Sequence, residues 1–430
     1  MSRWFNVAGP CRPDIHYMLP PTARIPEVMR LIHQQSYFVL HAPRQTGKTT
    51  AMLTLAQELT ASGQWTAVLL SVEVGSAFNA DPNTAELAIL DEWQNSATWQ
   101  LPTDLQPPTW IDAAPGSRIA SAFAAWAEAS PRPLVVLIDE IDSLQDATLI
   151  SVLRQLRSGY ARRPHAFPHA LALIGMRDVR DYKVAAGGSS RLGTASPFNI
   201  KSRSLTLGNF SATEVAALYA QHTHATGQIF TPEASAHAFH LTQGQPWLVN
   251  ALAKVAVEDL TPDPATPITP DVIDAAKDVL IQRQDTHLDS LAERLREPRV
   301  RAVIEPLLAN MVPTALPPDD IQLVLDLGLV RMDTAHGLVI ANPIYAAVIP
   351  RTLTFTTRSF FPLVAPTWLT ATGHLDPDRL LEAFLAFWRQ HGQPLLGTTA
   401  NHEIAPHRVL MAVLDRVANG GGRVEREYAV

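Results

Sequence analysis

Cysteine is almost absent from this chain of 430 residues, because Cys11 is its only one. A single thiol cannot form an intramolecular disulfide, so the sequence predicts a fold held together by its core in a reducing compartment. The first residues, 1–6, lack the apolar region of a secretion signal, and no uncharged apolar run approaches the length of a membrane span. We therefore expect a cytoplasmic protein with no membrane partner.

Basic residues are also too few for a protein that binds nucleic acid over its whole surface. Lysine and arginine together number 34 against 41 aspartates and glutamates, which gives a net charge of −7. This balance excludes a protein whose whole surface binds nucleic acid, although it is compatible with a local basic groove. The length favours two to four domains with ample cores, since 47% of the residues are hydrophobic. Prolines cluster in two expected loops, residues 101–116 and 261–271.

A phosphate-binding turn is the most specific motif. Residues 37–50 read Tyr-Phe-Val-Leu-His-Ala-Pro-Arg-Gln-Thr-Gly-Lys-Thr-Thr, an apolar strand that enters a turn, and residues 51–59 continue as a helix. Backbone N–H groups of such a turn favour an anion, the charge of Lys48 suits the β- and γ-phosphates, and the hydroxyl of Thr49 suits Mg²⁺. Ala42 replaces the usual first glycine, which a negative φ permits. The predicted nucleotide-binding residues are Pro43, Arg44, Gln45, Thr46, Gly47, Lys48, Thr49 and Thr50.

A pair of acids follows a second apolar strand. Residues 134–138 read Leu-Val-Val-Leu-Ile, which is typical of a strand buried on both faces, and Asp139 and Glu140 come next. We assign Asp139 to Mg²⁺ and Glu140 to the water that attacks the γ-phosphate, with Lys48 as the third catalytic residue. The pair favours hydrolysis of ATP over a small-molecule kinase. The alternatives are an acidic strand end that opens a helix, and a nucleotide binder without turnover.

The order of elements predicts an α/β fold. Further strands are expected at 65–72, 171–175 and 203–207, with inserted helices near 84–94 and 117–129. Strands alternating with helices indicate a parallel sheet covered on both faces. The first predicted domain, residues 1–207, is therefore a P-loop NTPase core with a central parallel sheet.

Downstream of the sheet the pattern becomes helical. Residues 208–284 predict a helical lid, with helices at 215–224, 232–242 and 246–260 and a capping box at Ser211 and Glu214. Residues 285–352 predict three helices and a hairpin with strands at 329–332 and 338–341, an arrangement typical of a winged helix. Acids outnumber arginines in that segment, so a packing or protein-contact module is favoured over DNA binding.

Together these motifs resemble an AAA+-related ATPase of the archaeal-type or STAND branch, over residues 10–352. The resemblance implies that residues 14–24 contact adenine, that Arg177 senses the γ-phosphate after the fourth strand, and that a Gly-x-Pro turn on the lid approaches the nucleotide. The residues implied on the adenine side and on the lid are Tyr17, Pro21, Arg24, Gly244 and Pro246. The plainer alternatives are a loose N-terminal strap and a helix start after a turn. No arginine finger is identifiable. Arg191 and Arg203 could each reach the nucleotide of a neighbouring subunit in an oligomer, but each is also typical of a solvated loop charge.

The last segment, residues 353–430, resembles the start of a PD-(D/E)XK nuclease-like domain. A helical pattern at 407–418 and a strand-like end at 423–430 carry this resemblance. Glu425 and Glu427 alone cannot form the metal site of such a nuclease, so we expect an incomplete domain without nuclease activity. An ordinary helical cap with a frayed tail is the alternative.

The sequence thus predicts a Mg²⁺-dependent ATPase, which converts ATP and water into ADP and phosphate. Its nucleotide state would drive a conformational switch that regulates a C-terminal effector or a partner. A protein partner or a homo-oligomer is compatible with this prediction. The alternatives are a DNA-processing ATPase that grips DNA through the winged helix, and a nucleotide-gated interaction module without turnover.

Overall fold

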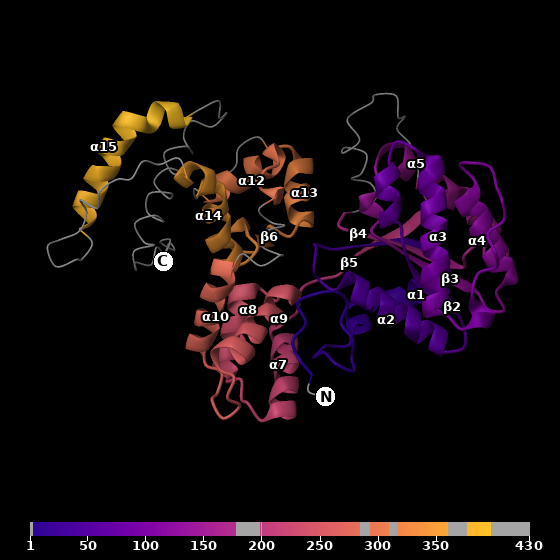
Figure 1. The fold of residues 1–430 in the computed structure, drawn as a ribbon, viewed down its shortest axis with the longest axis horizontal. Coiled ribbons are helices and arrows are strands. Elements are labelled where there is room, and N and C mark those ends of the chain that lie inside the picture. Colours follow the sequence, from indigo (N-terminus) through magenta and orange to yellow (C-terminus); the bar gives the residue numbers. More distant parts are fainter. Residues whose placement is uncertain are drawn as a thin grey trace. The chain divides into compact units, whose positions relative to one another are not determined.

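The computed structural model describes residues 3–177, 198, 200–283, 293–308, 316–359 and 376–396 (Figure 1). The chain divides into two compact units. The first consists of residues 1–239, 243–273 and 326–328, and the second of residues 240–242, 274–325 and 329–430. The parts that the sequence placed at 407–418 and 423–430, and Arg191, lie outside the described residues.

A five-stranded parallel sheet forms the centre of the first unit. In chain order its strands are β1 (Tyr37–His41), β2 (Thr66–Ser71), β3 (Leu134–Asp139), β4 (Ala170–Gly175) and β5 (Lys201–Thr206). Their order across the sheet is β2-β3-β4-β1-β5, and every pairing is parallel. The predicted fold class is confirmed, and the five predicted strands lie within two residues of the observed ones.

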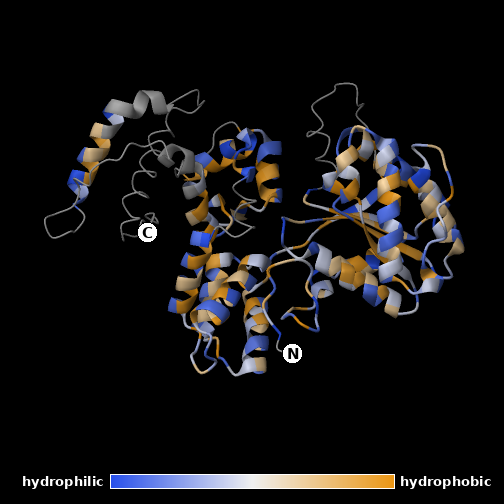
Figure 2. Ribbon diagram, viewed as in Figure 1, coloured by the Kyte–Doolittle hydropathy of each residue, from blue (hydrophilic) through white to orange (hydrophobic). Residues whose placement is uncertain are grey.

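Two helical layers cover the sheet because side chains alternate between its faces. On one face, Phe38 and Leu40 of β1 pack with α1 (Val28–His33) and α2 (Lys48–Ala61). On the other face, Tyr37 and Val39 pack with the layer of α3 (Pro82–Gln100), α4 (Arg118–Ala129) and α5 (Asp146–Ser158). Figure 2 shows hydrophobic strands beside helices that carry both hydrophobic and hydrophilic residues. Strands β3 and β4 are buried at every position, as their continuous apolar runs require.

The long crossover from β2 to β3 contains the two inserted helices that the sequence predicted. Helix α3 begins earlier than expected, because the side chain of Asp81 accepts hydrogen bonds from the N–H groups of Asn83 and Thr84, and Pro82 suits the first helical position. Short 3₁₀ turns, η2 (Glu73–Phe78) and η3 (Thr103–Leu105), complete this crossover.

Helices follow the sheet, as predicted. Helix α7 (Ala212–Thr226) opens with the capping box of Ser211 and Glu214, and α8 (Pro232–Thr242) has the predicted bounds. The helix expected at 246–260 is α9 (Pro246–Lys254), which continues as a π-helical turn over Val255–Leu260. A further helix, α10 (Pro270–Arg283), follows the Pro/Thr-rich segment.

The remaining described elements include the predicted hairpin. Strands β6 (Val330–Asp333) and β7 (Gly337–Ile340) pair antiparallel, and Asp333 accepts hydrogen bonds from the N–H groups of Ala335 and His336 in the turn. The helices of this region are α12 (Pro298–Leu308), α13 (Pro318–Asp326), α14 (Pro343–Ser359) and α15 (Pro377–Leu396). Part of the first helix expected here, around Leu288 and Leu291, lies outside the described residues.

Candidate nucleotide-binding site

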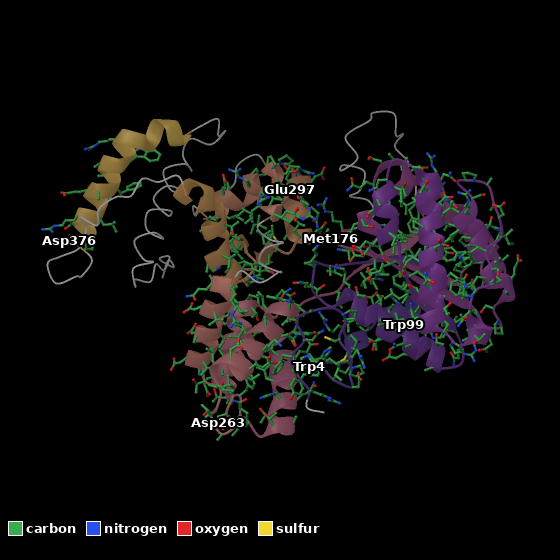
Figure 3. The ribbon with its side chains drawn as sticks, viewed as in Figure 1. Trp4, Trp99, Met176, Asp263, Glu297 and Asp376 are labelled. Atoms are coloured by element: carbon green, nitrogen blue, oxygen red, sulfur yellow. The ribbon has the colours of Figure 1, made fainter. Side chains whose placement is uncertain are left out.

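The candidate site lies at the carboxyl edge of the sheet, where three neighbouring strands end. The turn of residues 42–47 leaves β1 and enters α2, Asp139 ends β3, and Arg177 lies two residues beyond β4. Met176, labelled in Figure 3, marks this edge, and its N–H donates a hydrogen bond to Oδ1 of Asp142, 3.3 Å away. Because β4 pairs with both β1 and β3, the parallel sheet brings these segments to one edge.

The phosphate loop is held from its carbonyl side. Nζ of Lys48 donates to the carbonyl oxygens of Ala42 and Pro43, at 2.8 and 2.9 Å, and the hydroxyl of Thr46 also donates to Pro43, at 2.9 Å. Ala42 is buried and lies outside the left-handed region, so the missing glycine imposes no strain. Gly47 has a φ of 89°, which only glycine adopts readily.

The N–H groups at the start of α2 are left for a ligand. Among the described residues, the N–H groups of Gly47, Lys48 and Thr49 have no protein acceptor. Successive N–H groups at a helix N-terminus form a site for phosphate, where the helix dipole adds favourable potential. The observed cradle therefore fits the predicted phosphate groups.

A hydroxyl and a carboxylate meet beside this cradle. Oγ1 of Thr49 donates to Oδ2 of Asp139 over 2.8 Å, and Oδ1 of Asp139 accepts from the N–H of Glu140 over 2.9 Å. Burial raises the pKa of Asp139 above its ordinary value, against the hydrogen bond from Thr49. In the described part of the chain no three His, Cys, Asp or Glu side chains cluster as metal ligands. Two oxygen donors suit Mg²⁺, which takes its remaining ligands from phosphate and water.

Glu140 carries a partly buried carboxyl with a raised pKa. Burial, followed by repulsion from Asp139 and Asp142, raises the pKa of Glu140 to about 7. Its backbone is in the left-handed region, with a φ of 57°, an uncommon conformation for glutamate. A carboxyl whose pKa lies near neutrality can accept a proton from water. Burial lowers the pKa of Lys48, but the three nearby acids oppose that shift.

Tyr17 lies deep inside an aromatic cluster of the N-terminal segment and α7. The Tyr17 ring is 4.8 Å from that of Phe5 and 5.6 Å from that of His222, and its hydroxyl is buried without a hydrogen-bond partner among the described atoms. Figure 3 labels Trp4, which lies in the same segment. Cys11, in this segment too, donates its N–H to the hydroxyl of Thr50 in α2 over 3.0 Å. The N-terminal segment is therefore tied both to α2 and to α7.

Of the other residues implied by the resemblance, Arg24 contacts the phosphate loop directly, and Gly244 and Pro246 flank a residue that does. Pro21 and Arg24 bound the short turn η1 (Pro21–Arg24), and the guanidinium of Arg24 donates to the carbonyl oxygen of Thr46 over 3.2 Å. Gly244 and Pro246 flank Gln245, whose Nε2 lies 3.4 Å from the carbonyl oxygen of Gln45. Sequence reasoning missed Gln245, although its place inside the Gly-x-Pro turn was a signal.

The sheet order and the phosphate loop define a P-loop NTPase fold. Residues 38–167 match the family model described as "ATPase family associated with various cellular activities (AAA)". No curated protein matches the sequence. None of the described helices has both the length and the apolar character that a membrane span requires.

The chain is similar to several solved structures, to different extents. The chain is similar to the Walker-type ATPase paby2304 of Pyrococcus abyssi, with a TM-score of 0.53 and 11% identity over 80% of this chain and 99% of that chain. Aeropyrum pernix ORC2 gives a TM-score of 0.42 at 14% identity, over 82% of this chain and 96% of that chain. The Thermotoga maritima RuvB Holliday junction branch migration motor gives 0.39 at 15% identity, over 76% and 92%. Of these three, the Pyrococcus structure has a TM-score above 0.5, and at 11% identity this likeness supports the fold alone.

Proposed function

We propose that this protein is a Mg²⁺-dependent ATPase, which hydrolyses ATP to ADP and phosphate. The observation that carries the proposal is the 2.8 Å contact between the hydroxyl of Thr49 and the carboxylate of Asp139, beside the loop held by Lys48. The match of residues 38–167 to the AAA ATPase model supports it independently. ATP and Mg²⁺ are the ligands that this donor set fits.

Each residue near the cradle has a proposed role. The N–H groups of the loop and the charge of Lys48 bind the phosphates, and Thr49 and Asp139 hold Mg²⁺, which neutralises phosphate charge when bound. The carboxylate of Glu140 accepts a proton from water as the oxygen of that water bonds to the γ-phosphorus, and ADP leaves. The remaining proposed nucleotide-binding residues are Pro43, Arg44, Gln45, Thr46, Gly47, Thr50, Tyr17, Pro21, Arg24, Gly244 and Pro246. Arg177 is the proposed sensor of the γ-phosphate.

The second part of the proposal concerns the conformational change that ATP hydrolysis drives. Residues 208–284 act as a lid and residues 285–352 as a winged-helix-like domain, as in the STAND branch, and the nucleotide state biases their arrangement. The switch regulates a protein partner, a second copy of this chain, or an effector in residues 353–430. We place this activity in the cytoplasm.

A DNA-processing ATPase is the second candidate. The observation that favours it is the antiparallel hairpin of β6 and β7 next to helices α12 and α13 in the chain, since a winged helix binds DNA in many proteins. The pairing of four nearby arginines with acids argues against this candidate.

Phosphate release by the purified protein tests hydrolysis directly. We expect turnover in the wild type, loss of both binding and turnover in Lys48→Ala, and loss of turnover with retained binding in Glu140→Gln. Lys254→Ala is the matched control, because Lys254 is a half-exposed lysine of α9 paired with Glu258. A wild type that releases phosphate at the rate of Lys48→Ala would refute the proposed activity.

A further inference from the structure

Two carbonyl groups of the phosphate loop are held by side chains from outside the loop. The carbonyl oxygen of Thr46 accepts a hydrogen bond from Arg24, at 3.2 Å, and that of Gln45 accepts from Gln245, at 3.4 Å. Arg24 lies 22 residues before its acceptor and Gln245 lies 200 residues after its own. The loop is therefore gripped at neighbouring peptide groups by the N-terminal segment and by the helical region after the sheet.

Arg24 is fixed at both ends of its guanidinium. Besides Thr46, it donates to the carbonyl oxygen of Gly208 and lies over the ring of Phe210, 4.7 Å from the ring centroid. The guanidinium of Arg24 is largely removed from solvent, and this burial lowers its pKa to about 10. Its Nε is buried without a hydrogen-bond partner among the described atoms. These contacts hold the side chain in one orientation, with the loop carbonyl as one of its anchors.

Gln245 is equally constrained. Its Oε1 accepts the N–H of Leu248 over 2.6 Å, which caps α9, and the opposite side of the same amide faces Gln45. The preceding Gly244 is bonded to the segment that Arg24 contacts, since the N–H of Phe210 donates to the carbonyl oxygen of Gly244 over 2.8 Å. A closed ring of contacts thus joins the loop, Arg24, residues 208–210 and the turn before α9.

The geometry of the peptide group links these carbonyl contacts to the N–H groups of the loop. In a planar trans peptide the C=O and N–H groups point in opposite directions. The carbonyl of Thr46 shares its peptide with the N–H of Gly47, and the carbonyl of Gln45 shares its peptide with the N–H of Thr46. A donor that fixes either carbonyl outside the loop therefore directs the partner N–H to the inner side. Gln45 needs such support, because its φ of 58° is costly for a residue with a side chain.

We propose that Arg24 and Gln245 are positioning residues that orient the peptide groups of the phosphate loop, so that phosphate affinity depends on docking of the N-terminal segment and of the turn at Gly244–Pro246. The inference rests on the proposed nucleotide binding and adds its regulation. A partner or nucleotide state that withdraws either side chain would weaken phosphate binding without touching Lys48. Neither residue contacts the reacting atoms in this assignment.

Calorimetric titration of the full chain with MgADP and with MgAMP-PNP tests the assignment. Gln245→Ser keeps an N-cap oxygen for Leu248 but is too short to reach Gln45, and it introduces no charge. Arg24→Lys keeps the charge but loses the fork that spans two carbonyls. We expect each variant to raise Kd about tenfold, the effect of one lost hydrogen bond to a preorganised group.

Gln221→Ser is the matched control. Gln221 also joins the N-terminal segment to a helix, through paired hydrogen bonds with the backbone of Met18, but it does not touch the phosphate loop. The Kd of Gln221→Ser should stay within about twofold of the wild-type value, because the aromatic contacts of Phe5 and the bond from Cys11 to Thr50 still hold the segment, and Arg24 and Gln245 keep their contacts with the loop. Turnover should also change in the two positioning variants and not in Gln221→Ser. In the two positioning variants KM should change more than kcat, because both residues act on the binding of phosphate.

The outcomes separate the two proposals. If the wild type binds MgADP, Lys48→Ala does not, and both positioning variants bind like the wild type, the positioning role is refuted and nucleotide binding stands. Wild-type affinity in Arg24→Lys alone would show that Arg24 acts only as a charge. A wild type that binds neither nucleotide refutes the proposed function and this inference with it.

Discussion

Glu140 combines two energetically unfavourable features. Its backbone is left-handed, and its carboxyl is brought beside Asp139 and Asp142 in a partly buried site. Strain and like charge of this kind concentrate at functional sites, because the fold around them must compensate. Both features therefore support its proposed role as the base.

The pH dependence of turnover tests that role. With a pKa of about 7, the carboxyl of Glu140 is mostly protonated at pH 6 and mostly ionised at pH 8, and only the ionised form accepts a proton. We expect kcat/KM, which reports the free enzyme, to fall about tenfold from pH 8 to pH 6. In Glu140→Gln the residual kcat/KM should be flat over this interval. A wild-type kcat/KM that does not fall between pH 8 and pH 6 would contradict the role of Glu140 as the base.

The same carboxyl affects stability. Its pKa is raised from 4.5 to about 7, so the folded state holds the proton more tightly than the unfolded state does. Its contribution to stability is full below pH 4.5 and is lost as the pH rises through 7. Glu140→Gln should therefore raise the thermal midpoint of the nucleotide-free protein at pH 8 and change it little at pH 5. Equal shifts at both pH values would show that charge is not the cause.

The turn before α9 depends on a glycine for two reasons. Gly244 has a φ of 71°, and a Cβ there would lie 1.8 Å from the carbonyl oxygen of Phe210. Gly227, which ends α7, has a similar φ of 81° but open space around it. The comparison of these two positions separates backbone strain from crowding.

Replacement of each glycine by alanine should give different losses of stability. Gly227→Ala should lower the unfolding free energy by about 1 kcal/mol, because the alanine must adopt a left-handed backbone. Gly244→Ala must also displace Phe210, so we expect the larger loss and weaker binding of MgADP. Urea unfolding and calorimetry measure the two effects. Equal losses in the two variants would mean that the contact with Phe210 is not tight in solution.

The N-terminal segment packs into the aromatic cluster beside α7. Phe5 is buried, and its ring lies 4.8 to 6.2 Å from those of Tyr17, Tyr219, His222 and Phe230. Phe5→Ala should cost about 3–5 kcal/mol, through lost burial and the cavity left behind. Trp4→Ala is the control, because Trp4 is 39% exposed. Urea unfolding with equal losses for both variants would contradict this packing.

At the scale of the whole molecule, the distribution of charge argues against the DNA-processing candidate. In the described part of residues 285–352, four arginines are paired with acids, which leaves less positive charge for phosphates. The pairs are Arg294–Glu297, Arg299–Asp320, Arg301–Glu305 and Arg331–Asp333. The net charge of −7 adds to this argument.

We therefore expect no salt-sensitive binding of duplex DNA and no stimulation of ATPase activity by DNA. Filter binding at low and high salt, with phosphate release measured in parallel, tests the expectation. Binding that weakens steeply with salt, together with stimulated turnover, would favour the DNA-processing alternative.

Local pattern predicted much of the fold. The apolar runs of β3 and β4 are buried on both faces, the capping box of Ser211 begins α7, and the hairpin turns at Asp333, all as predicted. Each of these features depends on residues near one another in the chain, where period and turn chemistry act directly. Helix α9 ends sooner than expected, because its continuation winds as a π-helical turn.

The sequence by itself determined the phosphate loop, the acid pair and the parallel sheet, because those features are written in contiguous residues. The motifs also predicted that Thr49 and Asp139 meet at one Mg²⁺ site, and the structure shows their contact. Only the tertiary structure revealed that Arg24 and Gln245 hold carbonyl groups of the loop. Such contacts join residues 22 to 200 positions apart. Periodicity and turn signals carry no information about these pairings, which arise when packing of the sheet, the N-terminal segment and the helices brings distant backbone groups together.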